Sequence, residues 1–287
     1  MWKSAEDKAK RAEIFKDTQA YYKDNKILKD SIEESKKNTK LYSEEDYPLS
    51  KIDLGKSCEI TISGERTFES AIRLLKENPG KKVCVLNFAS AIKPGGGVVH
   101  GAGAQEECLC RCSTLYPLLN TAENKKAYYE PNKKLGDNLH TDDIIYTPDV
   151  VICKTDTAFP ERISEEEFAK VDVITCAAPN LNARDSKRYS GDNGFTGELS
   201  QEDLYKLHYK RCKHILNVAA ANGMDILLLG AFGCGAFKND PATVAKAMHD
   251  ACKEYAKAFD IINFAVVKKG GRTNENYRVF EIELERR

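Results

Sequence analysis

The sequence contains no apolar run long enough to cross a membrane, and its first segment, Met1 to Lys40, is strongly charged. A secretory signal peptide needs an apolar stretch there, so we expect a cytoplasmic protein without a membrane partner. Ten cysteines are present, but in reducing cytosol they indicate free thiols rather than disulfides. Most of them fall in apolar strand or helix patterns and are expected in the core: Cys84, Cys153, Cys176, Cys212 and Cys252.

Net charge is also missing, because 44 Lys and Arg residues balance 44 Asp and Glu residues. The whole molecule therefore exerts no long-range attraction on polyanions, and we expect no direct nucleic-acid binding. A local pocket can still hold a diphosphate, since helix N-termini and backbone amides bind anions without net charge. No internal repeat or low-complexity segment is evident.

What is present indicates a folded α/β protein. Hydrophobic residues make up 41% of the chain, with 13 Tyr and 11 Phe. Short continuous apolar segments alternate with helical patterns, which predicts a mixed or parallel sheet covered on both faces. The expected strands are 59–62, 83–87, 149–153, 171–176, 226–229 and 264–267. The expected helices are one from Thr67, as N-cap, to Gly80, then 106–119 ended near Pro117, 205–222 and 241–259.

The N-terminal region has a pattern of its own. Residues 5–28 are highly charged, with apolar residues at the spacing of one helical face, and 30–37 continues as helix. Asp46-Tyr47-Pro48 marks the end of this stretch. We therefore expect an N-terminal helical extension over 1–50 packed on a core of 51–287 as one structural unit. Residues 185–197, rich in Gly, Asn and Ser, are expected to form a surface loop.

The most informative motif is Lys93-Pro94-Gly95-Gly96-Gly97, followed seven residues later by Gln105-Glu106-Glu107. Glycines lack a Cβ and accept positive φ, so a triple glycine lets main-chain amides approach an anion closely. It follows an apolar strand, and ligands of such sheets lie at the carboxyl ends of the strands. A second glycine-rich segment, 230–237, follows another strand. We infer that the two loops flank one phosphate-bearing ligand.

The two glutamates are consecutive at the start of an expected helix, so their side chains project about 100° apart. They cannot form the facing carboxylate pair of ordinary glycosidases and should have different roles. Cys108, Cys110 and Cys112 alternate in the same segment, but residues two apart on a helix face away from each other. We therefore expect no metal site.

These motifs resemble the microbial type of poly(ADP-ribose) glycohydrolase, whose hallmark is a triple glycine followed after six to eight residues by Gln-Glu-Glu on a macrodomain fold. The resemblance covers most of the chain, including the charged N-terminal extension. The segments that carry it are, in chain order, Asn87 to Ser90, Lys93 to Gly97, Gln105 to Glu107, Cys110 to Ser113, Tyr146 to Val150, Ala177 to Asn180, Gly230 to Phe237 and Asn239 to Pro241.

The resemblance implies a macrodomain-like three-layer α/β/α fold with a mixed central sheet. It implies hydrolysis of ribose–ribose O-glycosidic bonds in poly(ADP-ribose) to release ADP-ribose, with Glu107 as general acid and base and Glu106 holding ribose hydroxyls. No cofactor is implied. The residues it assigns to substrate binding are Asn87, Gly95, Gly96, Gly97, Val98, Gln105, Gly233, Cys234, Gly235, Ala236 and Phe237.

Other functions remain open at this point. The chain can instead be a hydrolase of single ADP-ribose units on arginine or other side chains, or a reader that binds ADP-ribose without cleaving it. The pair Glu106-Glu107 argues against a pure reader, because a second carboxylate near an anionic ligand weakens binding. We expect a monomer whose partner is ADP-ribose or its polymer attached to protein. The zero net charge favours action at chain ends.

Overall fold

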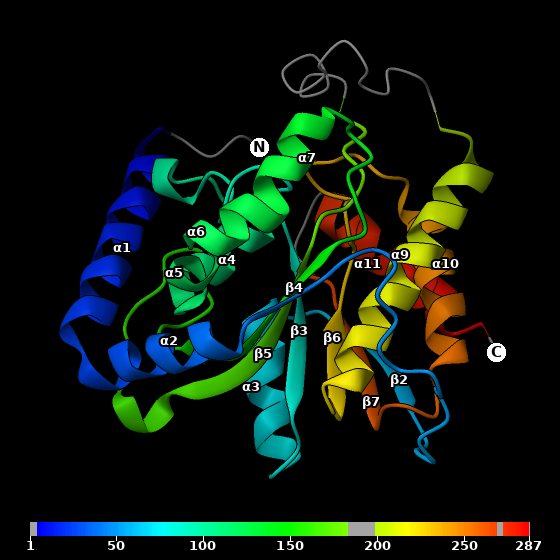
Figure 1. Ribbon diagram of the computed structural model, residues 1–287, viewed down its shortest axis with the longest axis horizontal. Helices are drawn as coiled ribbons and strands as arrows, with labels where there is room; N and C mark the ends of the chain where they lie inside the picture. Colours follow the sequence, from blue (N-terminus) through cyan, green and yellow to red (C-terminus); the bar gives the residue numbers. More distant parts are fainter. Residues whose placement is uncertain (1–4, 183–198, 269–271, 287) are drawn as a thin grey trace.

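The computed structural model describes residues 5–182, 199–268 and 272–286. Within this part of the chain, one mixed seven-stranded sheet runs through the molecule in the order β1-β4-β5-β3-β6-β7-β2 (Figure 1). The five strands from β5 to β2 are parallel, and β4 and β1 add an antiparallel edge. The strands are β1 (Lys40–Tyr42), β2 (Glu59–Ser63), β3 (Val83–Phe88), β4 (Ile144–Ile152), β5 (Ala169–Cys176), β6 (Ile226–Leu229) and β7 (Ile261–Ala265).

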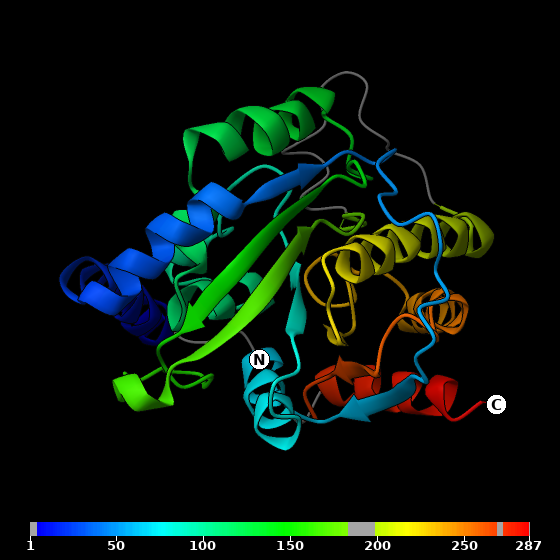
Figure 2. The ribbon, with the colours of Figure 1, turned by 60° about the horizontal axis from the view of Figure 1, so that its bottom comes forward.

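Helices cover both faces of the sheet, which makes a three-layer α/β/α fold (Figure 2). Alternate residues of β3 enter opposite cores: Cys84 and Leu86 face α9 and α10, while Val83 and Val85 face α3 and α4. The helical segments are α1 (Ala5–Asp24), α2 (Lys26–Asn38), α3 (Thr67–Glu77), η1 (Val98–His100), α4 (Gln105–Cys112), α5 (Leu115–Leu119), α6 (Ala122–Asn124), η2 (Lys125–Tyr129), α7 (Glu130–Leu135), η3 (Glu165–Glu167), α9 (Gln201–Ala221), α10 (Pro241–Glu254) and α11 (Arg272–Leu284).

The N-terminal helices are part of the packed molecule. Phe15 of α1 and Leu28 and Ile32 of α2 are buried in the same core as α3, α4 and β3. The chain then forms β1, which pairs with β4 at the edge of the sheet. The division into an extension of residues 1–50 and a core of 51–287 stays a prediction.

The fold class and most expected elements are confirmed, including the helical N-terminal segment and the apolar strands β3, β5 and β6. The expected helix over 5–28, continuing through 30–37, is instead broken at Asn25, because this residue is extended and its side chain caps α2. Another helix was wrong: the expected 106–119 is two helices, because Ser113 is extended and bridges to Ile152. Pro117 lies inside α5 and does not end it. The N-cap of α3 is Arg66 rather than Thr67, and its amide donates to Glu69 Oε2 at 3.2 Å.

Some boundaries differ from expectation. β4 begins five residues before the expected strand, since its first half pairs with both β1 and β5, and β7 begins three residues earlier at Ile261. The segment from α6 to α7 and the C-terminal helix α11 were not expected. The expected loop at 185–197 lies outside the described residues. Among the described helices, none combines the length and apolarity that a membrane crossing requires.

Candidate active site

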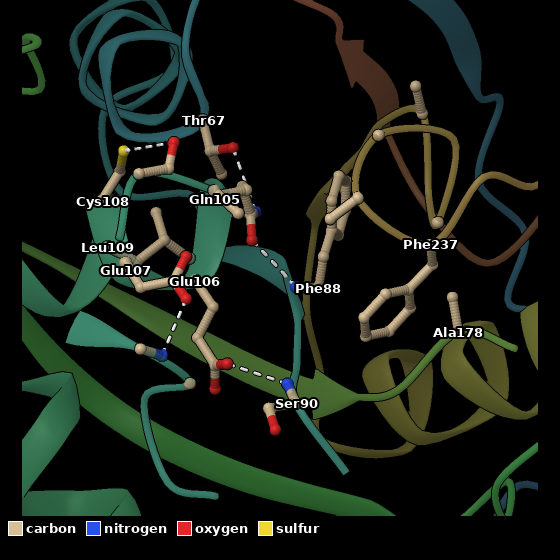
Figure 3. Close-up of a pocket in the computed structure, with 18 of the residues that line it drawn as sticks. Thr67, Phe88, Ser90, Gln105, Glu106, Glu107, Cys108, Leu109, Ala178 and Phe237 are labelled. Carbon is tan, nitrogen blue, oxygen red and sulfur yellow. Dashed lines mark hydrogen bonds between the residues drawn. The ribbon is translucent and has the colours of Figure 1, made fainter. Parts of the chain in front are cut away.

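One cavity of about 950 Å³ opens at the carboxyl ends of the parallel strands. Phe88, Ala178, Ala231 and Val266, which end or follow four adjacent strands, all line it. The topology therefore places the cavity where ligands of α/β sheets bind. Figure 3 shows Glu106 and Glu107 on one side of it and Phe237 across from them.

The start of α4 is fixed to the end of β3 by Gln105. Its Oε1 accepts a hydrogen bond from the amide of Phe88 at 2.9 Å, and its Nε2 donates to Thr67 Oγ1 at 3.2 Å (Figure 3). The same Nε2 also donates to the carbonyl of Leu86 at 2.8 Å. Gln105 thereby acts as a bridge between strand, helix α3 and helix α4. This anchoring sets where the next two side chains of α4 point.

Glu106 is only 2% exposed. Its Oε2 accepts from the amide of Ser90 at 2.8 Å, and its Oε1 faces Asn87 Nδ2 at 3.4 Å. Burial raises the pKa of Glu106 well above its ordinary value, and the neighbouring Glu107 raises it further, although the hydrogen bonds from Ser90 and Asn87 oppose the change. Glu106 therefore retains a proton at pH values where an exposed glutamate has lost it.

Glu107 is 7% exposed and lines the cavity. The amide of Gly97 donates to its Oε1 at 2.9 Å, which fixes one carboxyl oxygen (Figure 3). The other oxygen, Oε2, is buried and has no hydrogen-bond partner in the described part of the chain. One oxygen is thus held by the protein, while the second has no protein partner among the described residues.

Residues 95–102, called here the glycine loop, need glycine at position 96 for two reasons. Gly96 has φ of +55°, a conformation that disfavours other residues. A Cβ built there would lie 2.6 Å from Glu107 Oε1 and 3.0 Å from Glu106 Oε2. The backbone therefore touches both carboxyl groups directly, which brings the two glutamates to one point of the loop despite their divergence on the helix.

The second glycine-rich segment forms the opposite wall. Buried Asn239 joins it to the end of β5: Nδ2 donates to the carbonyls of Pro179 at 2.7 Å and of Gly233 at 3.1 Å, and Oδ1 pairs with His208 Nε2 at 2.9 Å. Burial lowers the pKa of His208 to about 4, so this histidine is neutral. The wall is held by uncharged hydrogen bonds.

The structure brings most of the expected site residues to the cavity wall. Those that line it are Gly96, Gly97, Gln105, Glu106, Glu107, Gly233, Gly235, Ala236 and Phe237. The remaining four are not among the lining residues: Asn87, Gly95, Val98 and Cys234. Asn87 is buried behind Glu106, and the side chains of Val98 and Cys234 are in the core. Their assignment to substrate binding stays a prediction.

Several residues that line the cavity were not predicted from the sequence. Arg66 and Asp156 face each other across 3.7 Å, and Arg66 Nη1 lies 3.6 Å from Cys108 Sγ. His140 and Asn276 contribute from a loop and from α11. Only Arg66 carried a usable signal, as the residue before a helix; the others come from segments without a pattern.

The cysteine array does not share one environment. Arg111 Nη2 donates to Cys108 Sγ at 3.2 Å, while Cys110 and Cys112 are buried. All ten cysteines are free thiols in the structure. Within the described residues, no three His, Cys, Asp or Glu side chains are grouped in a way that could hold a metal ion.

Comparisons with known proteins agree with this geometry. The family model described as "Microbial-type PARG, catalytic domain" matches residues 9–155. Poly(ADP-ribose) glycohydrolase from Thermomonospora curvata is 29% identical, with 95% of this chain and 98% of that chain covered and a TM-score of 0.79. The same enzyme bound to the inhibitor ADP-HPD, also 29% identical with the same coverage, gives a TM-score of 0.77.

A second glycohydrolase extends the comparison. Poly(ADP-ribose) glycohydrolase from Deinococcus radiodurans in complex with ADP-ribose is 32% identical, with 88% of this chain and 97% of that chain covered and a TM-score of 0.74. No curated protein matches the chain.

Proposed function

Because the chain belongs to the microbial-type poly(ADP-ribose) glycohydrolase family and is a glycohydrolase of ADP-ribose polymers, we propose that Glu107 is the general acid and base of its reaction. The observation that carries this proposal is the arrangement of the Glu107 carboxyl. One oxygen is fixed by the Gly97 amide, and the other is buried at the cavity wall without a protein partner.

In the proposed complex, ADP-ribose lies along the walls of the cavity. The diphosphate lies between the glycine loop and the segment from Gly233 to Phe237, where backbone amides bind anions without net charge. We place the terminal ribose against Glu106 and Glu107, which face Phe237 across the cavity (Figure 3). The relatives crystallised with ADP-ribose and with ADP-HPD support this class of ligand.

The chemistry follows from a single catalytic carboxyl. Protonated Glu107 Oε2 donates its proton to the departing ribose oxygen as the C1″–O bond breaks, which leaves an oxocarbenium-like ribose. The same oxygen, now ionised, takes a proton from the water that attacks C1″. The proton lost in the first half is recovered in the second, so the enzyme returns to its starting state.

Glu106 has a different task because it is held differently. One oxygen of Glu106 accepts from the Ser90 amide, and burial and Glu107 raise the pKa of its carboxyl. Glu106 can therefore donate one hydrogen bond to a ribose hydroxyl and accept another from it. It orients the sugar, so that C1″ faces Glu107.

Release of free ADP-ribose from poly(ADP-ribose) tests the role of Glu107. Glu107→Gln keeps an oxygen that can accept from the Gly97 amide but removes the acidic proton that the reaction transfers, so we expect kcat to fall about a hundredfold to ten-thousandfold. Calorimetry should show ADP-ribose binding close to that of the wild type. Glu123→Gln, at an exposed helix start, serves as the control. Wild-type turnover by Glu107→Gln would exclude the proposed role.

The setting of the reaction is also part of the proposal. The substrate is polymer attached to protein, held locally by one chain acting as a monomer. The protein works in the cytoplasm, a reducing compartment that suits ten free thiols.

A further inference from the structure

Arg11 in the charged helix α1 is buried although no carboxylate of the described residues pairs with it. Its side chain is 3% exposed. Its Nε donates to the carbonyl oxygen of Gly101, in the glycine loop, at 2.7 Å, and its Nη1 has no partner in the described residues. Burying a guanidinium without a counter-charge is unfavourable. Burial of Arg11 therefore does not by itself stabilise the fold, and the hydrogen bond of its Nε is to the glycine loop.

The glycine loop also contacts the backbone of α1 (Figure 1). Gly101 has φ of +70°, and a Cβ there would lie 1.9 Å from the carbonyl oxygen of Lys8. Gly103 lies against the guanidinium, since its Cβ would be 3.4 Å from Arg11 Nε. The backbones of helix and loop are thus in direct contact at Gly101, while Arg111 Nη1 of α4 donates to the next carbonyl of the loop, Ala102 O, at 2.6 Å.

Hydrogen bonds inside the glycine loop transmit this position to the catalytic carboxyl. The amide of Gly101 donates to Val98 O at 3.0 Å, and the amide of Ala102 donates to Gly97 O at 3.1 Å. Gly97 in turn donates its amide to Glu107 Oε1 at 2.9 Å. Two short steps therefore separate the Arg11 contact from the bond that orients Glu107.

A second contact of α1 supports the other end of the loop. The ring of Phe15 meets the ring of Tyr116 edge-on, with centroids 4.9 Å apart. The ring of Tyr116 packs against Gly95, since a Cβ at Gly95 would lie 2.7 Å from Tyr116 Cδ2. Both ends of the loop are thus held from α1.

We propose that Arg11 is a positioning residue for the hydrolysis, holding the glycine loop through Gly101 so that the Gly97 amide stays on Glu107. This inference rests on the catalytic role of Glu107 proposed above. It assigns the N-terminal helix a part in turnover in addition to its part in the fold. Arg11 acts through the loop and does not line the cavity.

Two variants of equal length isolate the hydrogen bond. In Arg11→Gln the amide Nε2 occupies the place of Arg11 Nε and can donate to Gly101, whereas in Arg11→Met a methyl group stands there. Both remove the charge. We expect kcat on poly(ADP-ribose) to fall tenfold to a hundredfold in Arg11→Met, the range for a small misplacement of a catalytic group, with KM within about threefold. Arg11→Gln should regain most of the lost kcat.

The control variant loosens α1 elsewhere. Asp17 pairs with buried Lys154 at 2.7 Å and with Arg162 rather than with the glycine loop. Asp17→Asn should lower the Tm while kcat stays within about twofold. Equal kcat loss in Arg11→Met and Arg11→Gln, or the same loss in Asp17→Asn, would overturn the proposal, because helix docking in general would then explain the effect.

Amide exchange supplies a readout that does not depend on activity. By NMR, the Gly97 amide should exchange at least about tenfold faster in Arg11→Met than in Arg11→Gln, at matched global stability. Equal exchange would contradict the proposal. If Glu107→Gln turns over like the wild type, the role of Glu107 fails, yet the exchange rates still decide whether Arg11 holds the loop.

If Arg11→Met does not fold, Phe15→Leu tests the same claim at Gly95. It keeps an apolar side chain but removes the ring contact with Tyr116. A kcat loss of fivefold or more with ADP-ribose binding retained would support positioning by α1. An unchanged kcat together with unchanged Gly97 exchange would refute it.

Discussion

At the scale of single residues, the site combines two carboxyl groups that the protein holds in different ways. Glu107 is oriented by a backbone amide, and Glu106 is buried with a raised pKa. Both contact the same glycine, Gly96. The geometry needed for chemistry therefore works against the stability of the fold, because two carboxyl groups are brought together out of water.

Glu106→Gln should make the folded protein more stable than the wild type at high pH. The folded-state pKa of Glu106 is raised, so the wild type loses stability as pH rises from the unfolded value of about 4.3 through the folded value. The variant has no such loss. We expect its Tm to exceed that of the wild type by at least about 2 °C at pH 8 and to match it near pH 4, by scanning calorimetry. Asn87 Oδ1, which is buried without a partner in the described residues, can then accept from the new amide. A lower Tm at pH 8 would contradict this prediction.

Gly96→Ala should strongly reduce turnover. The added methyl would lie 2.6 Å from Glu107 Oε1 and force the carboxyl or the loop to move. We expect kcat to fall about a hundredfold or more. Gly80→Ala is the matched control, since Gly80 has φ of +83° with nothing within 4 Å. It should cost about 1–2 kcal/mol of folding free energy from backbone strain alone and leave kcat unchanged. Similar kcat loss in both variants would show that strain, not the contact, matters.

At the scale of elements, helix α9 fixes the loop before β4 through one buried ion pair. Arg211 Nε donates to Asp142, and its Nη1 and Nη2 donate to the carbonyls of Ala177 at 2.7 Å, Leu139 at 3.0 Å and His140 at 3.1 Å. His140 lines the cavity. The pair therefore joins α9 to one wall of the site.

Asp142→Asn should be strongly destabilising. Burial alone would raise the pKa of Asp142, but Arg211 and Lys210 outweigh it and lower this pKa. The resulting stabilisation is present at neutral pH and is lost as pH falls through the lowered value. Leaving Arg211 unpaired should cost about 3–5 kcal/mol at pH 7, measured by urea unfolding, and much less once the pH has fallen below the lowered pKa of Asp142. Asp250→Asn, which breaks a partly exposed pair with Lys246, should change stability far less. Equal losses in the two variants would argue against the buried pair.

At the scale of the whole molecule, burial leaves few thiols accessible. Only Cys58 and Cys108 are partly exposed, and burial raises the pKa of Cys58 to about 11. We expect Ellman's reagent to react readily with one thiol in the native protein and with ten after denaturation. Cys108 lines the cavity, so ADP-ribose should slow the native reaction. In Cys108→Ser, the rapid reaction of the native protein with Ellman's reagent should be absent. Rapid reaction of Cys108→Ser, or no protection by ADP-ribose, would place the reactive thiol outside the site.

The sequence by itself determined the architecture and the location of the chemistry. Continuous apolar strands can be satisfied only by a sheet buried on both faces, and β3, β5 and β6 follow from this. The glycine loop and the two glutamates are local motifs, so their proximity follows from a short stretch of chain. Side-chain periodicity also located the helices α1, α2, α9 and α10.

Only the tertiary structure decided which remote residues complete the site. The break between α4 and α5 depends on Ser113 bridging to Ile152, a partner distant in sequence. The same holds for the contact of Arg11 with Gly101, which spans 90 residues, and for Arg66 beside Asp156. Such contacts depend on how separately formed elements dock. Their energy comes from burial and from hydrogen bonds made at docking, which leave no periodic trace in the sequence.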